Sequence, residues 1–342
     1  MKRFVMLAAL LSAGSGATMA EPRLAPATTP VEASNRVVLL VDEIRAIRNF
    51  PVLVAEQLGY LREGPMAVTV VNTRNEVWHG DQLRDGRIDA VLAYWHHNIV
   101  NQAQGFQTQA IVTLGLAPGM QVLVSNRARA RLHSPSDLKG ARIISGGAGS
   151  SKTTVVNSLV MAGGLRPTDY VRLGTEGKEK NAALLADGGA DLIVAPVPDG
   201  DYYLKRGVAN MFADLTTVDG TRAALGTPFP TSTVYMASDR IKAHPEIARL
   251  LARAFVRTLR YINTHSAEQI AALIPADVKG KDEAAYLAML REQIGMFAAD
   301  GHMPEDGARQ EWRVLAAFEP EYATVKVEDT YTNRFVDEAR TR

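Results

Sequence analysis

One short unit occurs twice in the chain and constrains its fold more than any other feature. The sequence LRDGRIDAVLA at 83–93 has a counterpart, LADGGADLIVA, at 185–195. In both copies a helix pattern ends at Asp-Gly, where glycine suits the left-handed end of a helix, and an apolar strand follows a second aspartate. Two unrelated helix–turn–strand units could also match in this way, because they share the same sequence preferences. The equivalent place of the match in the two halves favours two repeated α/β lobes.

Strand and helix patterns alternate through both halves. In the first half, apolar runs predict strands at 37–41, 68–71, 86–93, 109–114 and 121–125, with helices at 51–58, 76–84 and 96–104. In the second half, strands at Arg142, 170–173 and 191–195 alternate with helices at 152–162 and 178–186. Beyond Pro245 the patterns are helical, at 246–263, 267–274, 282–297 and 305–315, with one strand at 323–327. This α/β alternation predicts mostly parallel sheets of the doubly wound type.

The N-terminus has the pattern of a secretory leader. Lys2 and Arg3 precede an apolar segment at 4–11, and small residues end at Ala20, which predicts a signal peptide over 1–20 that is cleaved before Glu21. The apolar run is much shorter than the roughly 20 residues that span a bilayer. Residues 21–35 are rich in Pro, Ala and Thr and form the expected disordered linker. We therefore expect a soluble periplasmic protein.

Composition removes several classes of function. The 342 residues contain no cysteine, which excludes disulfides, a thiol nucleophile and lipid attachment through an N-terminal cysteine. The formal net charge is +1 and becomes −1 when Lys2 and Arg3 leave with the leader, so no basic field attracts nucleic acid. A 46% share of hydrophobic residues supports a sizeable core, and the length suggests two domains.

A loop rich in glycine and serine, at 145–151, lies between a strand pattern and a helix pattern. Backbone N–H groups at such a helix start suit an anionic ligand, so Gly149, Ser150, Ser151 and Lys152 are candidate contacts. The alternative is that Ser151 only caps the helix and Lys152 points into solvent. The segment nearly matches the phosphate-binding loop of NTPases, but serine replaces its second glycine. The leader also disfavours an NTPase, because ATP is scarce outside the cytoplasm.

The order of several motifs resembles one known family. The segment 51–60 reads P-x-x-x-A-E-x-x-G-Y, the first Asp-Gly unit follows at 83–93, and S-D-L-K-G at 136–140 precedes the glycine/serine loop. A-G-G-L at 162–165 and the second Asp-Gly unit complete the series. Over 36–336 the chain resembles the periplasmic substrate-binding proteins of ABC importers, of the type that includes nitrate, sulfonate, taurine and thiamine-pyrimidine-precursor receptors.

The resemblance implies the two-lobed type II fold of periplasmic binding proteins, in which each lobe is a mostly parallel sheet flanked by helices, here with a helical C-terminal segment. Two strands cross between the lobes, and we expect 36–125 and 231–342 in the first lobe and 126–230 in the second. Hinge closure would then hold the ligand in the cleft between the lobes. The family's default is a monomer that docks on the transmembrane subunits of an ABC permease, with no cofactor and no metal.

Six loops after predicted strands are expected to converge on this cleft, because ligands of open α/β sheets bind beyond the carboxyl ends of the strands. These loops lie at 42–50, 94–98, 114–120, 145–152, 196–202 and 231–233. In the first loop, Arg45 and Arg48 suit a carboxylate, sulfonate or phosphonate, or else form a solvated basic loop. Asn49 and Phe50 come next. Asn49 would cap the following helix, and Phe50 would staple it or form a wall of the pocket.

Aromatic residues and histidines follow the third predicted strand. Tyr94 and Trp95 are typical of the flat wall of a small-molecule pocket, although Trp95 also suits the core. His96 is a candidate ligand contact at the start of the next helix. No partner is spaced from His96 and His97 as metal ligation requires, so no metal site is expected.

Two further candidates lie in the second half and at the return crossing. Asp199 accepts a hydrogen bond from the ligand or caps the helix expected near Asp201. Thr231 lines the cleft or is an ordinary strand residue. The positive groups Arg45, Arg48 and Lys152 favour an acidic ligand, and Tyr94 and Trp95 leave room for a ring or an apolar body.

The sequence thus predicts an exported receptor that captures a small organic acid, such as a sulfonate or carboxylate, for an ABC importer. The alternatives are a ligand-binding component of a sensory system and an enzyme similar to thiamine-pyrimidine synthases. Those enzymes use a cysteine-rich segment, which this chain lacks, and neither G-x-S-x-G nor H-E-x-x-H occurs. We therefore expect no enzymatic activity.

Overall fold

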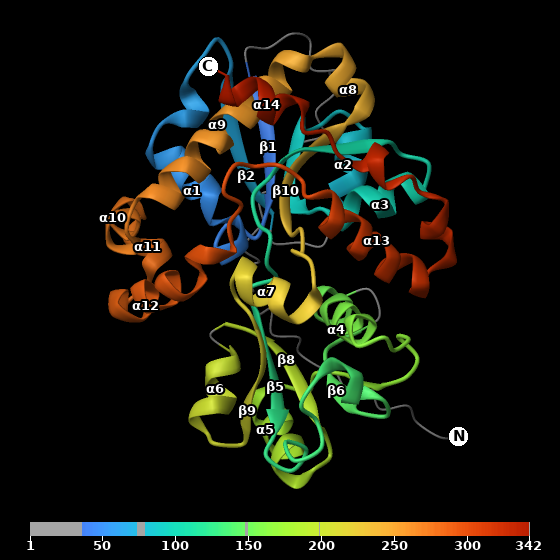
Figure 1. The fold of residues 1–342 in the computed structure, drawn as a ribbon. Coiled ribbons are helices and arrows are strands. Elements are labelled where there is room, and N and C mark those ends of the chain that lie inside the picture. Colours follow the sequence, from blue (N-terminus) through green and yellow to red (C-terminus); the bar gives the residue numbers. More distant parts are fainter. Residues whose placement is uncertain (1–35, 74–78, 148–149, 198, 342) are drawn as a thin grey trace, which may run out of the picture.

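The computed structural model describes residues 36–73, 79–147, 150–197 and 199–341. The predicted signal peptide (1–20), the predicted linker (21–35) and Gly149 lie outside these residues. The chain forms two lobes, each built on one five-stranded sheet with flanking helices. The first lobe lies at the top of Figure 1 and the second at the bottom. None of the helices in the described part of the chain has the length and apolar character that a membrane span requires.

The sheet of the first lobe has the strand order β2–β1–β3–β10–β4. Its strands are β1 (Arg36–Asp42), β2 (Ala67–Thr73), β3 (Ala90–Tyr94), β4 (Thr108–Thr113) and β10 (Ser232–Ala237). β1 runs parallel to β2 and β3, whereas β10 runs antiparallel to β3 and β4. All strands except β10 therefore share one direction, and β10 is the strand that returns from the second lobe.

The sheet of the second lobe repeats this arrangement, with the order β7–β6–β8–β5–β9. Its strands are β5 (Met120–Ser125), β6 (Arg142–Ile144), β7 (Val171–Leu173), β8 (Leu192–Pro196) and β9 (Ala209–Leu215). β6 is parallel to β7 and β8, and β5 is antiparallel to β8 and β9. The prediction of mostly parallel sheets is confirmed, with one reversed strand in each. The division at residue 125 stays a prediction, and the pairing of β5 indicates that the first crossing comes before this strand.

An aspartate has the same role in both sheets. Val38 N donates to Asp89 Oδ2 at 2.8 Å, and Asp89 N donates to Val38 O at 3.0 Å. In the second lobe, Arg142 N donates to Asp191 Oδ2 and Asp191 N donates to Arg142 O, both at 2.8 Å. Arginine side chains complete both sites, because Arg240 Nη2 lies 2.6 Å from Asp89 Oδ1 and Arg142 Nη2 lies 3.0 Å from Asp191 Oδ1. These are the second aspartates of the two Asp-Gly units, so the repeat in sequence corresponds to a repeat in structure.

The two segments that join the lobes lie side by side. Gly115 N, in the linker between β4 and β5, donates to Ser232 O at 3.2 Å, and Thr231 N donates to Gly115 O at 2.9 Å. Phe229 N donates to Leu116 O at 2.9 Å. A Cβ atom on Gly115 would lie 2.2 Å from Thr231 Oγ1, so this close approach requires glycine. The hinge is thus a pair of hydrogen-bonded linkers.

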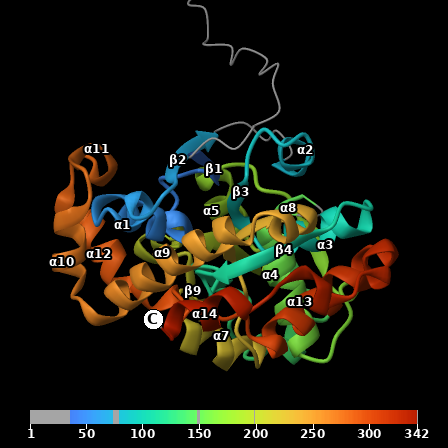
Figure 2. The same cartoon turned by 90° about the horizontal axis from the view of Figure 1, so that it is seen from above.

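Helices cover both faces of each sheet. In the first lobe, α1 (Phe50–Gln57), α9 (Pro245–Thr264) and α14 (Arg334–Arg340) pack on one face, and α2 (His79–Arg84), α3 (His96–Ala103) and α13 (Glu305–Phe318) pack on the other. Neighbouring residues of β1 serve the two layers, since Leu39 and Leu40 belong to different apolar clusters. Figure 2 shows α9 beside α1 and α14. In the second lobe, α4 (Ser151–Ala162) and α7 (Val218–Leu225) cover one face, and α5 (Lys178–Asp187) and α6 (Asp199–Lys205) cover the other.

The remaining elements are short. They are α8 (Ser238–Ala243), α10 (Ala267–Leu273), α11 (Ala276–Lys279) and α12 (Glu283–Gln293), with 3-10 helices at Ile47–Asn49, Tyr60–Arg62, Pro135–Leu138, Ile294–Met296, Pro320–Thr324 and Val327–Thr330. The strand predicted at 323–327 is wrong, because two 3-10 helices occupy this region. The helix predicted over 282–297 divides into α12 and a 3-10 turn, and β9 and α7 were not predicted.

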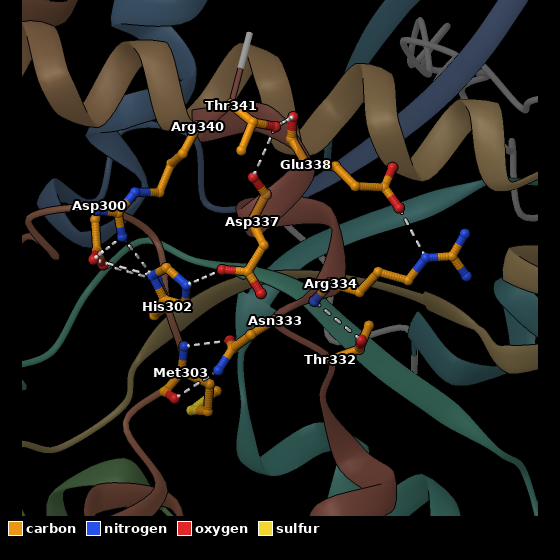
Figure 3. A network of polar contacts seen from close by, with 10 residues as sticks. All are labelled: Asp300, His302, Met303, Thr332, Asn333, Arg334, Asp337, Glu338, Arg340 and Thr341. Carbon is orange, nitrogen blue, oxygen red and sulfur yellow. Dashed lines mark hydrogen bonds and ion pairs between the residues drawn. The ribbon is translucent and has the colours of Figure 1, made fainter.

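A polar network attaches the C-terminal helix to the segment that leads into α13 (Figure 3). His302 Nε2 lies 2.8 Å from Asp337 Oδ1 on α14, and His302 Nδ1 lies 3.0 Å from Asp300 Oδ2. Arg340 Nη1 donates to the same Asp300 oxygen at 2.9 Å. These contacts hold the end of the chain in the first lobe.

The paired aspartates give a first prediction. Asp89→Asn and Asp191→Asn should each lower the free energy of unfolding by about 1.5–3 kcal/mol, because each removes a buried, charged acceptor of hydrogen bonds. Urea denaturation measures this loss, and Asp85→Asn, at an exposed carboxylate of the first unit, is the matched control. Equal stability of the Asp89 and Asp85 variants would contradict the assignment.

The second aspartate also predicts a dependence on pH. Burial opposes the charge of Asp191, but hydrogen bonds from Arg142 and Arg131 hold the pKa of its carboxyl below the ordinary value. A carboxyl with a lowered pKa stabilises the fold above its unfolded pKa, and this contribution disappears as pH falls through the folded pKa. The stability difference between the wild type and Asp191→Asn should therefore shrink below about pH 4.

Candidate functional site

Arg48 lies at the carboxyl edge of the first sheet, among groups that balance its charge. Its Nη2 lies 3.2 Å from Asp42 Oδ2 and 3.1 Å from Glu43 Oε2, and its guanidinium carbon lies 5.0 Å from the ring centroid of Tyr94. Burial acts most strongly and disfavours the charge, but Tyr94, Asp42 and Glu43 together hold the pKa of Arg48 above its ordinary value. The structure thus brings two predicted residues, Arg48 and Tyr94, together, and carboxylates already occupy the guanidinium.

Arg45 does not belong to this group. Its Nη2 lies 3.1 Å from Asp277 Oδ2 of α11, and both side chains are mostly exposed. Such an exposed pair contributes little to stability, at most about 1 kcal/mol. Each predicted arginine thus already pairs with a carboxylate through Nη2, which offsets its charge, whereas the buried Nε of Arg48 has no hydrogen-bond partner among the described residues.

Asn49 is a buried part of the scaffold. Its Nδ2 donates to the carbonyl oxygens of Asp42 and Glu43, and Ser232 Oγ donates to Asn49 Oδ1 at 3.3 Å. Its side chain does not cap α1, contrary to the expectation from its position. Asn49 instead connects the turn after β1 to β10.

Three other predicted contacts are buried. Phe50 packs on Phe297, with 6.2 Å between the ring centroids, and Thr231 Oγ1 donates to Ala117 O at 3.4 Å beside the hinge. Trp95 is among the largest fully buried side chains, and its indole N–H has no hydrogen-bond partner among the described residues. Packing thus accounts for Phe50, and a hydrogen bond accounts for Thr231, without a ligand.

The glycine/serine loop leads into α4 of the second lobe. Ser150, rather than Ser151, is the cap of this helix, and its Oγ accepts a hydrogen bond from Thr153 N at 3.3 Å. Thr153 Oγ1 in turn donates to Gly147 O at 2.9 Å, which holds the loop against the helix. Lys152 is half-buried and forms no ion pair with any residue that the structure describes.

Asp199 is the first residue of α6, so this helix begins two residues before the predicted position. Its Oδ1 lies 2.6 Å from Lys178 Nζ at the start of α5. This ion pair joins the starts of two helices in the second lobe.

A cavity of about 340 Å³ lies where helices of the two lobes meet. Its walls come from α3 and the end of α13 in the first lobe and from α4 in the second: His96, His97, Val100, Val314, Leu315, Phe318, Glu319, Tyr322, Thr153, Thr154 and Asn157. His96 is the predicted contact that lines it. Because α13 packs against α4, movement of the lobes would change the shape of this cavity.

A second cavity, of about 400 Å³, lies between α2 and α8 at the opposite edge of the first sheet. Residues of the first lobe alone line it.

Glu311 of α13 lies next to His96 and was not predicted. Its side chain is 1% exposed, neither carboxylate oxygen has a hydrogen bond, and Oε1 lies 3.7 Å from His96 Nδ1. Burial raises the pKa of Glu311, and His96 opposes this rise. The helical repeat of the sequence could have identified Glu311. It shares the buried face of α13 with Ala308 and Val314, and a carboxylate is unusual on such a face.

The rings of the adjacent histidines contact each other. The rings of His96 and His97 meet edge to face, with centroids 4.7 Å apart. Protein metal sites collect three or more ligands around one point, and the described ranges of the chain contain no such group of His, Asp or Glu.

A known family covers most of the chain that forms these two lobes. Residues 47–269 match the family described as NMT1/THI5 like. The chain belongs to the NMT1/THI5-like family. No curated protein matches the sequence significantly.

Solved structures share the fold of this NMT1/THI5-like protein along most of its length. A protein of Bordetella bronchiseptica RB50 is 27% identical, with a TM-score of 0.69, and the match covers 90% of this chain and 98% of that chain. The putative periplasmic sulfonate-binding protein SsuA of Methylobacillus flagellatus KT is 17% identical, with a TM-score of 0.67 and coverage of 90% and 94%. The periplasmic nitrate-binding protein NrtA of Synechocystis PCC 6803 is 12% identical, with a TM-score of 0.60 and coverage of 90% and 89%. The predicted periplasmic binding protein fold is therefore confirmed.

The two arginines of the first loop make a matched pair of variants. Arg48→Gln should lower the free energy of unfolding by about 1–3 kcal/mol, because it leaves Asp42 and Glu43 without their cation in a partly buried position. Arg45→Gln should change it by less than about 0.5 kcal/mol, because its ion pair is exposed. Urea denaturation of both variants compares them directly, and equal losses would contradict the different roles assigned here.

Proposed function

We propose that this protein is the solute-binding component of an ABC import system and works in the periplasm. The observation that carries this proposal is the cavity between α3, α13 and α4, whose walls belong to both lobes. Two lobes that rotate about paired linkers enclose a solute when its contacts favour the closed state. The similarity to proteins named as sulfonate- and nitrate-binding supports the same role.

We further infer that the solute is a small organic acid. The start of α4 supports this, because its backbone N–H groups and the unpaired Lys152 favour negative charge. The apolar part of the cavity, with Val100 and Leu315, leaves space for an organic body. The paired Arg45 and Arg48 support an acid less than their sequence positions suggested.

The partners follow from this role. The closed receptor would dock on the transmembrane subunits of an ABC permease, as a monomer and without a cofactor or metal. The predicted signal peptide is consistent with delivery to the periplasm.

A thermal-shift screen tests the proposal. The mature chain, from residue 21, is screened against alkanesulfonates, carboxylates and nitrate, with amines and neutral sugars for comparison. A solute at about 100 times its dissociation constant should stabilise the fold by roughly 2.7 kcal/mol, which raises the melting temperature visibly. Stabilisation by neutral or cationic compounds alone would contradict the acid, and stabilisation by no compound in a broader solute library would contradict the receptor.

Lysine variants at the two ends of α4 test where the acid binds. Lys152→Ala should reduce the shift caused by acids. Lys139 directly follows the 3-10 helix that packs against the other end of α4. The control variant Lys139→Ala should therefore leave the thermal shift unchanged. Equal effects of the two variants would argue against ligand contact at the start of α4.

A further inference from the structure

Glu311 is the buried ionisable group that the packing of the first lobe does not explain. Neither of its oxygens has a hydrogen-bond partner, although the side chain is almost fully enclosed. An isolated buried carboxylate costs several kcal/mol of stability, so such a group is normally protonated or paired with a cation. The charged or ionisable group in contact with Glu311 is His96.

His96 stands between this carboxylate and the cavity. Its Nδ1 faces Glu311, its ring stacks on Tyr94 with 5.4 Å between centroids, and its side chain is 14% exposed and lines the cavity. Nδ1 and Nε2 of an imidazole point in widely different directions. When Nδ1 is directed toward Glu311, Nε2 is left for a group inside the cavity.

The two residues together hold one proton in either of two ways. The pair is either a neutral acid beside a neutral imidazole or a carboxylate beside a protonated imidazole, and both forms have zero net charge. A negative group that enters the cavity near Nε2 favours the second form, because it interacts with the charged ring and the carboxylate is screened behind it. The carboxylate thus makes positive charge available at the wall of the cavity.

We propose that Glu311 and His96 form a proton-sharing pair that presents a protonated imidazole to the interlobe cavity, where it binds the acidic group of the solute. This inference rests on the proposed function and deepens it, because it assigns the recognition of the acid to His96. Glu311 is a positioning residue, since it acts through the histidine. The neutral polar residues Thr153, Thr154 and Asn157 of α4 line the same cavity from the second lobe.

The other charged groups around His96 do not replace this role. Arg48 lies over the ring of Tyr94, which stacks on His96, and Asp42 and Glu43 balance the charge of Arg48. Glu319, at the end of α13, lines the cavity but is exposed to solvent, which screens its charge. The other ionisable side chains that line the cavity are His97 on α3 and Tyr322 in the 3-10 helix after α13.

The pair predicts the direction of a pH effect. The acid binds the form in which the pair has its proton, so affinity is highest at low pH and falls as the pair loses that proton. A lysine or arginine in this place would keep its charge throughout the neutral range and would give a flat profile.

The first test follows the charge of the His96 ring with and without an acid in the cavity. The mature wild type, Glu311→Gln and the matched control Glu319→Gln are labelled with ¹⁵N-histidine, and the ring signals of His96 are assigned by their absence in His96→Asn. We expect excess ethanesulfonate or benzoate to increase the protonated fraction of the His96 ring at pH 7 in the wild type and in Glu319→Gln, and to increase it at least threefold less in Glu311→Gln. An equal increase in the wild type and in Glu311→Gln would overturn the proposal.

The second test uses ethanesulfonate and benzoate as probes, by calorimetry between pH 5.5 and 8.5. Glu311→Gln and His96→Asn should each weaken binding at least tenfold and flatten the pH profile, whereas Glu319→Gln should do neither. Full affinity in both variants would overturn the proposal. If the wild type binds both acids and the two variants bind them equally well, the proton-sharing pair is wrong while the proposed function stands. If the wild type binds neither acid, the result contradicts the acidic solute of the proposed function.

Discussion

A buried aspartate at the start of a central strand is the constraint on which both lobes depend. Asp89 and Asp191 each hold the backbone of the neighbouring strand through two hydrogen bonds and an arginine. They therefore fix the register of β3 against β1 and of β8 against β6. This register brings the carboxyl ends of the strands in each lobe to the side where the other lobe lies. An unpaired carboxylate at these depths would be costly, so the arginines are part of the same unit.

The sequence predicts that arginines after the first strand bind an acidic ligand. The structure distributes the charge at the junction of the lobes differently. Arg48 is balanced by Asp42 and Glu43, and the turn that contains them is held by Asn49. Carboxylates thus offset the charges of both arginines of this loop. Lys152 at the start of α4, in contrast, forms no ion pair with a described residue, and the buried Glu311 lies beside His96. The cavity between the lobes is lined by this histidine and by residues of α4.

Most of the fold was predictable from the sequence, because it depends on local patterns. Asp-Gly ends a helix, apolar runs form strands, and the repeat of both reveals two lobes. The sequence does not reveal β9, because its burial pattern is irregular, and the strand expected at 323–327 fails because the apolar residues there belong to single turns. For the candidate site, the sequence analysis named His96, which lines the cavity between the lobes, and the loop before α4. It could not show that Glu311, more than two hundred residues later, meets His96, since only tertiary packing brings α13 against α3.

The two linkers of the hinge pair with each other as well as joining the lobes. Their hydrogen bonds run from Gly115 to Ser232 and from Thr231 and Phe229 back to the other linker, so the hinge has the character of a short two-stranded ribbon. Because a ribbon bends and twists more easily than it stretches, these hydrogen bonds keep the two lobes from drifting apart. It also means that a single break in the backbone of either linker would leave the lobes held by the intact linker and by the hydrogen bonds between them. The order of the chain, which crosses twice, thus gives the molecule mechanical redundancy at its narrowest point.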